Sequence, residues 1–133
     1  MIHGSCLCGS VRYEIRGPLG PVTHCHCSQC RKTHGAAFGT YVRVDRADFT
    51  LTSGESDIQS YPSSPGVLRT FCRQCGSTLQ FLRESRPDSF SIAIGTLDDD
   101  PGVRPSHHIF VGSKAPWFDI TDGLPQHEER KPA

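Results

Sequence analysis

The 133-residue chain lacks long apolar runs. Nowhere does it approach the roughly 20 consecutive apolar residues that a membrane-spanning helix needs. Its first residues, MIHGSCLCGSVRYEI, also lack the basic segment and apolar stretch of a secretory signal. We therefore expect a cytoplasmic protein without a membrane partner.

The chain also lacks an excess of charge of one sign, since Lys plus Arg and Asp plus Glu number 14 each. A broadly basic surface, which attracts the phosphates of nucleic acids, is therefore not expected. No phosphate-cradling glycine motif, nucleophile elbow or H-E-x-x-H pair of zinc ligands is present. Nucleic acid is accordingly not a predicted partner.

Long helical patterns are missing too, and 13 Gly and 10 Pro interrupt the chain, with turn clusters at residues 17–21 and 61–66. Short runs that alternate apolar and polar residues predict strands at 11–15, 40–44, 49–52, 67–71, 78–82 and 89–94. One short helix is predicted, with Ser28 as its N-cap and Gly35 as its stop. The prediction is a mainly β domain, residues 1–124, followed by a charged tail, 125–133, that we expect to be mobile.

What the chain does have is cysteine. Its seven cysteines form three groups, at residues 6 and 8, at 25, 27 and 30, and at 72 and 75. The number is odd, and an unexported protein keeps its thiols reduced, so metal binding is favoured over disulfides.

The first and last groups together supply four thiolates, those of Cys6, Cys8, Cys72 and Cys75. Zinc holds thiolates at about 2.3 Å, so each pair of ligands must come from a tight turn. Gly9 and Gly76 follow the two pairs and can adopt the positive φ that closes such a turn. This spacing predicts a closed structural zinc site.

The middle group, Cys25, Cys27 and Cys30, lies within six residues and can direct three sulfurs at one ion. Three protein ligands leave a fourth position open, which is typical of catalytic or substrate-binding zinc. An all-sulfur site also favours a soft fourth ligand, namely a thiol.

Two alternatives for the middle group remain open at this point. It could be three buried free thiols, or a second structural zinc site closed by a histidine. The candidate histidines are His24, His26, His34, His107 and His108.

Three cysteine motifs carry a resemblance to a known family: GSCLCG at 4–9, CHCSQCRK at 25–32 and FCRQCGS at 71–77. With IGTLD at 94–98, PSHHIF at 105–110 and KAPW at 114–117, they resemble the glutathione-dependent formaldehyde-activating enzymes, a family that includes centromere protein V. All seven cysteine positions match, and the resemblance covers nearly the whole chain.

The resemblance implies small antiparallel sheets packed in one zinc-stabilised domain, as in zinc chaperones of Rab proteins and methionine sulfoxide reductase B. It implies two Zn²⁺ per chain, divided as above, and a carbon–sulfur lyase that condenses glutathione, or a related thiol, with formaldehyde or another small aldehyde. The alternative is a non-enzymatic zinc module that binds glutathione or a protein partner.

The implied chemistry uses a zinc-bound thiolate, and other residues are candidates for supporting it. Arg31 and Lys114 could hold the carboxylates of glutathione, and Arg31 and Lys32 could offset the negative charge of the thiolates. His107 or His108 could move a proton. Because neighbouring residues on a strand face opposite sides, at most one of these histidines reaches a given site.

Overall fold

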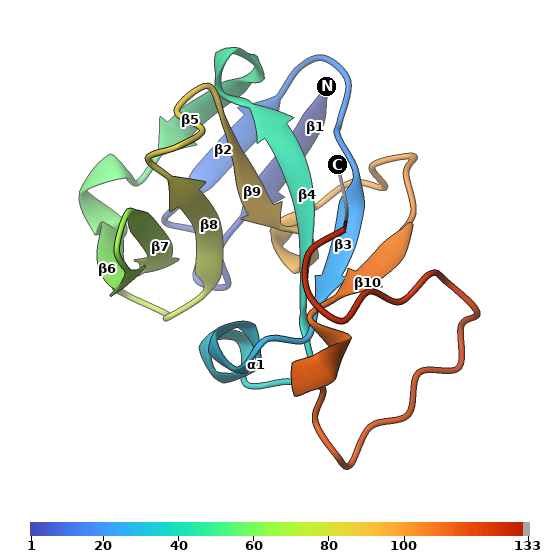
Figure 1. The fold of residues 1–133 in the computed structure, drawn as a ribbon. Coiled ribbons are helices and arrows are strands. Elements are labelled where there is room, and N and C mark those ends of the chain that lie inside the picture. The colour runs from blue at the N-terminus through green and yellow to red at the C-terminus, as the bar shows by residue number, and fades with distance from the viewer. Residues whose placement is uncertain (132–133) are drawn as a thin grey trace.

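A computed structural model describes residues 1–131, which form ten strands, one α-helix and four short 3₁₀ helices (Figure 1). The strands are β1 (Ile2–Ser5), β2 (Arg12–Ile15), β3 (Val22–Cys25), β4 (Gly39–Asp45), β5 (Phe49–Ser53), β6 (Ile58–Ser64), β7 (Val67–Cys72), β8 (Thr78–Arg83), β9 (Ser89–Ala93) and β10 (His107–Ile109). The helices are α1 (Ser28–His34), η1 (Arg46–Asp48), η2 (Glu55–Asp57), η3 (Ile94–Thr96) and η4 (Val111–Ser113).

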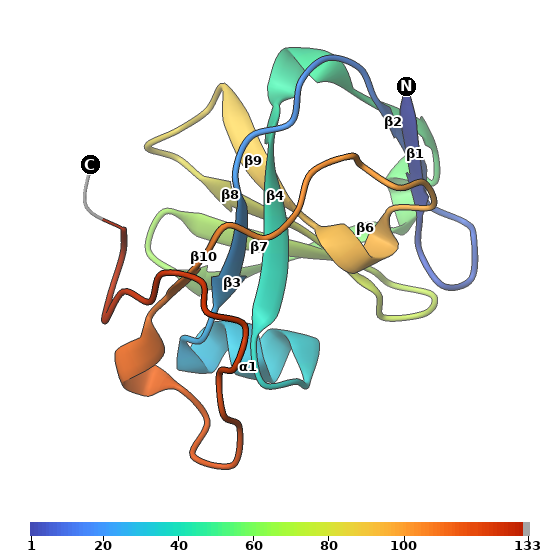
Figure 2. The same cartoon turned by 90° about the vertical axis from the view of Figure 1, so that its right-hand side faces the viewer.

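The strands form two sheets, one of three strands in the order β1-β2-β5 and one of seven in the order β10-β3-β4-β9-β8-β7-β6. All neighbouring pairs are antiparallel except β10 and β3. Figure 2 shows β1 and β2 at one side of the long sheet, with α1 below it. The predicted mainly β fold with small sheets and at most short helices is confirmed.

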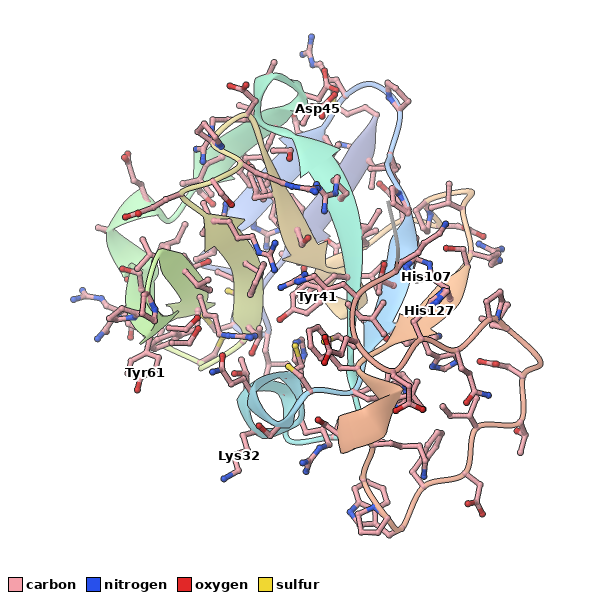
Figure 3. All side chains as sticks on the ribbon, in the orientation of Figure 1. Lys32, Tyr41, Asp45, Tyr61, His107 and His127 are labelled. Atoms are coloured by element: carbon pink, nitrogen blue, oxygen red, sulfur yellow. The ribbon has the colours of Figure 1, made fainter. Side chains whose placement is uncertain are left out.

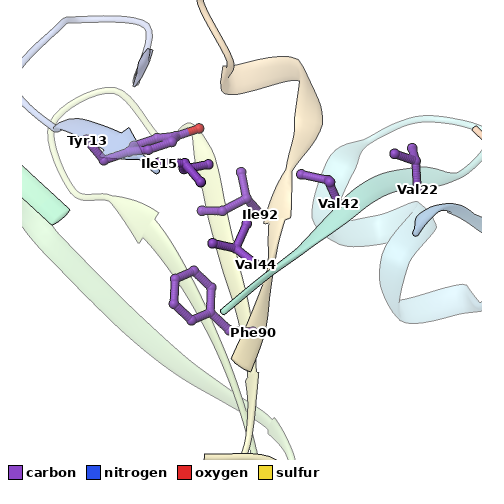
Figure 4. Packing of buried hydrophobic residues seen from close by; sticks show 7 residues of the cluster. All are labelled: Tyr13, Ile15, Val22, Val42, Val44, Phe90 and Ile92. Carbon is purple, nitrogen blue, oxygen red and sulfur yellow. The ribbon is translucent and has the colours of Figure 1, made fainter. Parts of the chain in front are cut away.

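The main core lies between the two sheets (Figure 4). Its buried residues are Tyr13, Ile15, Val22, Val42, Val44, Phe90 and Ile92. On β2, β4 and β9 they occupy every second position, because successive side chains of a strand point to opposite faces. The intervening positions of the long sheet therefore face away from this core, toward the candidate site.

All six predicted strands are present, but β1, β3, β6 and β10 lie outside the predicted ranges. The end of β6 falls in the turn cluster predicted at 61–66, so most of that cluster is strand and the predicted turn is too long. Pro62 lies in the edge strand of the sheet, where a missing N–H is tolerated, and the pairing register shifts between Pro62 and Ser64. The tight turn is therefore confined to residues 65–66.

Helix α1 forms where the sequence predicts it, with its N-cap shifted by one residue. Cys27, not Ser28, is the N-cap, and its sulfur accepts a hydrogen bond from the backbone N–H of Cys30 at 3.3 Å. Gly35 ends the helix with φ 61°, as predicted. Among residues 1–131, no helix is long and apolar enough to cross a membrane.

The segment after residue 124 runs beside β10. His108 N–H donates to Pro125 O at 2.9 Å, His127 N–H donates to His108 O at 3.0 Å, and Phe110 N–H donates to Glu129 O at 2.9 Å. These bonds satisfy backbone groups of β10 at the edge of the sheet. The described part of the predicted tail is thus attached to the domain, and residues 132–133 lie outside the described residues.

Candidate metal centres and the adjoining cavity

The four cysteines predicted to form a closed site come together in the structure. Their sulfurs all lie within 4.8 Å of one another, a spacing that could hold a metal ion. Cys8 Sγ lies 3.6 Å from Cys6 Sγ and 3.8 Å from Cys72 Sγ, across 64 residues of sequence. The site would therefore fasten the N-terminal segment to the β7–β8 hairpin.

Two similar turns aim these sulfurs at one point. Gly9 and Gly76 both have φ of 81°, a left-handed conformation that side chains with a Cβ rarely adopt. Gly9 N–H donates to Cys6 O at 3.1 Å, and Gly76 N–H donates to Cys72 O at 2.7 Å. The predicted role of both glycines in closing the turns agrees with this geometry.

Cys25, Cys27 and Cys30 form a second sulfur cluster within the same 4.8 Å limit. Cys25 ends β3, Cys27 caps α1 and Cys30 lies in the first turn of the helix. Cys25 and Cys30 are buried, whereas Cys27 is partly exposed. Within residues 1–131 no histidine joins this cluster as a fourth ligand, so the histidine-closed alternative is not supported.

A cavity of about 430 Å³ opens beside the second cluster. The sulfurs of Cys25, Cys27 and Cys30 line it together with five arginines, and no acidic residue is among the described residues that line it. The arginines are Arg43, Arg69, Arg83, Arg86 and Arg130. A chain of zero formal net charge thus concentrates positive charge at one place.

Strand register brings two of these arginines, Arg43 and Arg69, into one row across the sheet. Arg43 on β4 is paired with Ser91 on β9, which is paired with Phe81 on β8, and Phe81 in turn is paired with Arg69 on β7. These residues occupy the positions between the core residues, so they face away from the core. A row of one position from each of four neighbouring strands therefore forms a wall of the cavity, with an arginine at each end.

Arg69 connects this wall to the sulfurs. Its side chain is buried, with 5% exposed, and its two terminal nitrogens lie 3.7 and 3.8 Å from Cys30 Sγ. It also donates to the Tyr41 hydroxyl at 3.2 Å and lies over the Phe81 ring. Burial lowers the pKa of Arg69, but neighbouring Cys30 and Tyr41 raise it by more, so the guanidinium stays charged.

The three thiols of the second cluster shift one another's pKa in different directions. Hydrogen bonds from Cys25 and Cys30 lower the pKa of Cys27 far below its usual value. The pKa of Cys25 is raised, first by its side-chain hydrogen bond with Cys27 and second by that with Cys30. The pKa of the partly exposed Cys27 is thus lowered and that of the buried Cys25 raised.

The basic residues predicted to hold substrate lie elsewhere. Neither Arg31 nor Lys114 lines the cavity. Lys114 Nζ donates to the backbone oxygens of Ala115 and Phe118, in its own loop. Lys32 projects from the outer side of α1 (Figure 3), so the charge beside the thiolates comes from Arg69 instead.

The histidines predicted to move a proton also lie outside the cavity lining. His107 contacts Thr23 and Ser106, whereas His108 contacts His26 and Asp122, which agrees with their predicted placement on opposite faces.

A hydroxyl that the sequence analysis missed does line the cavity. Tyr41 is 7% exposed, lies above α1 in Figure 3, and its hydroxyl is 2.8 Å from His34 Nε2. Burial, then the charge of Cys30, raises the pKa of Tyr41, so it stays protonated.

Comparison with known proteins gives a consistent result. The profile of a family described as glutathione-dependent formaldehyde-activating enzyme matches residues 1–113. A Halomonas elongata protein named "Putative glutathione-dependent formaldehyde-activating enzyme" is 30% identical over 128 residues, 90% of this chain and 81% of its own length. A Schizosaccharomyces pombe protein named as an uncharacterized lyase is 28% identical over 120 residues, 90% of this chain and 85% of its own length.

A solved structure of a Rhodobacter sphaeroides protein superimposes with a TM-score of 0.62 and 26% sequence identity, covering 77% of this chain and 91% of that protein. The family match contains all seven cysteines, and both sulfur clusters lie within it. The fold, the two clusters and the matched length agree, and the chain belongs to the glutathione-dependent formaldehyde-activating enzyme family.

Proposed function

We propose that this chain is a carbon–sulfur lyase-type enzyme that condenses glutathione, or a closely related thiol, with formaldehyde or another small aldehyde. One observation carries the proposal: three cysteine sulfurs and five arginines line the same cavity. Family membership and the lyase named among the relatives support the same reaction class.

Both sulfur clusters fit Zn²⁺, which is bound by thiolates in closed four-ligand sites and in open three-ligand sites. A positive charge lies next to the thiolates of the second cluster, because the buried Arg69 side chain is beside Cys30. An ion held there would keep a substrate thiol in its nucleophilic thiolate form at neutral pH.

The arginines of the cavity can bind the carboxylates of glutathione. Glutathione carries two carboxylates, and guanidinium groups bind carboxylates through paired hydrogen bonds. Arg43 and Arg83 line the same cavity and contact no sulfur in the described hydrogen bonds, so they can hold a carboxylate while the thiol lies at the second cluster. The cavity volume lies within the roughly 300–1,000 Å³ typical of small-molecule sites.

In the reaction the substrate sulfur adds to the aldehyde carbon, one carbon–sulfur bond forms, and the carbonyl oxygen takes up a proton. We assign delivery of that proton to the Tyr41 hydroxyl, which lines the cavity and is hydrogen-bonded to His34. Its place beside Arg69 also provides positive charge near an oxygen that becomes anionic.

The test compares glutathione with S-methylglutathione, which keeps both carboxylates and lacks the thiol. Zinc-loaded wild type should bind glutathione more tightly than S-methylglutathione, and Cys27→Ser should abolish this preference. The rate at which glutathione adds to formaldehyde can be measured by NMR exchange spectroscopy. Wild type should raise this rate above that of the uncatalysed reaction, and Cys27→Ser should not.

Arg12→Ala, a substitution outside the cavity lining, is the control and should behave as wild type. Tight glutathione binding without faster addition would reject the enzyme and leave the thiol-binding module. Equal binding of the two ligands would reject the proposed site.

A further inference from the structure

A third group of ligand atoms lies on the other face of β3 from Cys25. Thr23 and Cys25 line the cavity, so the intervening His24 points to the opposite side. There it meets His108, its partner in the parallel pairing of β3 and β10, and Asp122 of the C-terminal segment. One ligand atom from each of these three residues lies within 4.8 Å of the others.

We propose that His24, His108 and Asp122 form a third metal site, which binds a divalent ion such as Zn²⁺ or Co²⁺. Two imidazoles and one carboxylate are a common ligand set for such ions. The proposal does not depend on the function proposed for the cysteine clusters.

The hydrogen bonds around the two imidazoles support this assignment. In metal sites a ligating histidine usually has its other ring nitrogen fixed by a hydrogen bond. His24 Nδ1 lies 2.8 Å from Thr40 Oγ1, and its Nε2 has no hydrogen bond to any of the described residues; His108 Nδ1 lies 2.7 Å from His26 Nε2. Each imidazole is thus oriented through the nitrogen that the ion does not need.

Asp122 supplies an anionic ligand at an accessible edge. Its Oδ2 lies 2.8 Å from His108 Nε2, and its Oδ1 accepts a hydrogen bond from Leu124 N–H at 3.0 Å. His108 is buried, whereas 41% of the Asp122 side chain is exposed, so an ion and its waters can enter from that side. Binding would replace the proton that His108 and Asp122 share.

His26 makes the inner end of this network unusual. It is fully buried, and its Nδ1 has no hydrogen-bond partner among the described residues. When His108 Nε2 binds an ion, His108 Nδ1 carries the proton and donates to His26 Nε2. In this arrangement the buried His26 orients His108, a ligand of the proposed ion.

An ion at this place would join three parts of the fold: β3, β10 and the segment around residue 122. The same β3 carries Cys25 on its other face. The ion would therefore stabilise the strand that supports the second sulfur cluster and would hold the C-terminal segment against it.

The experiment adds Co²⁺ to full-length protein whose two cysteine clusters are already filled with Zn²⁺. One further equivalent should bind, with weak visible absorption and without the near-ultraviolet sulfur-to-cobalt band of thiolate sites. Asp122→Asn and His24→Gln should each weaken this binding at least tenfold, and Thr40→Val should weaken it about 10- to 100-fold through the orientation of His24.

Asp119→Asn is the control, because it removes the same charge from the same segment. In the Asp122→Asn variant the new amide oxygen can still accept a hydrogen bond from His108. If Asp122 only held His108 in place and did not bind the ion, this variant would bind Co²⁺ as wild type does. That result, or the absence of a further Co²⁺ ion in wild type, would overturn the proposal. Glutathione binding at the sulfur cluster, measured in parallel, tests the proposed function separately.

Discussion

Replacement of Arg69 by methionine tests whether a buried guanidinium strengthens metal binding at the second sulfur cluster, the proposed open site. Methionine keeps most of the apolar contact with Phe81 and removes the charge 3.7 Å from Cys30 Sγ. A hydrogen bond to a charged group contributes about 1.5–3 kcal/mol, so zinc at the second cluster should bind about 10- to 150-fold more weakly.

Of the two proposed zinc ions, only the one at the second cluster should be affected. Competition with a chromophoric chelator should remove the ion of the second cluster at lower chelator concentration and leave the ion of the first cluster unaffected. Arg69→Lys should lie between wild type and Arg69→Met, because it keeps the charge and loses the paired geometry.

Arg83→Met is the matched control, since Arg83 also lines the cavity and also lies over Phe81, but contacts no sulfur in the described hydrogen bonds. It should weaken glutathione binding and leave both ions in place. Folding is checked by circular dichroism, because removing one member of a buried charged pair costs about 3–5 kcal/mol. Unchanged zinc affinity in folded Arg69→Met would refute the reasoning.

Three further predictions follow from the same geometry. Cys72→Ala should prevent folding, since structural zinc contributes about 10–16 kcal/mol, whereas Cys30→Ala should stay folded with one ion. Circular dichroism and metal analysis distinguish the two variants. A cooperative unfolding transition of Cys72→Ala near the wild-type Tm would contradict this prediction. Tyr41→Phe should lower kcat about 10²–10⁴-fold with glutathione affinity unchanged, and full activity in the variant would remove Tyr41 from the mechanism. Gly76→Ala should lower the free energy of unfolding by about 1–2 kcal/mol, because the backbone φ is 81° there, even though an added Cβ would meet nothing within 4 Å. Urea unfolding measures this free energy, and an unchanged value would contradict the prediction.

Much of the fold can be predicted because its signals are local. Alternation along β4 and β9 reports which face is buried, and Gly35 marks the end of α1. β3 and β10 are harder to place, because each is short and carries histidines, which lie at buried or half-buried positions. Thr23 of β3 bonds His107 of β10 across 84 positions of sequence, and His108 bonds His26 across 82.

The substrate-binding candidates show where local reasoning stops. The sequence favours Arg31 because it follows Cys30 directly, yet Arg69, 39 residues away, contacts that sulfur. Arg43 and Arg69 each sit within a predicted strand among apolar residues, which is also the pattern of a solvent-facing position. Only the order of strands in the sheet distinguishes a cavity wall from a solvated surface.

The sequence by itself determined the division of seven cysteines into four and three, because zinc coordination requires close pairs from tight turns, and glycines mark those turns at Gly9 and Gly76. Only the tertiary structure decided what surrounds the open cluster. Charge and histidine networks are assembled by pairing of distant strands, and a strand's own sequence does not specify its neighbour. The arginines beside Cys30, and the histidines behind Cys25, became visible only when β3, β4, β7 and β10 were placed in one sheet.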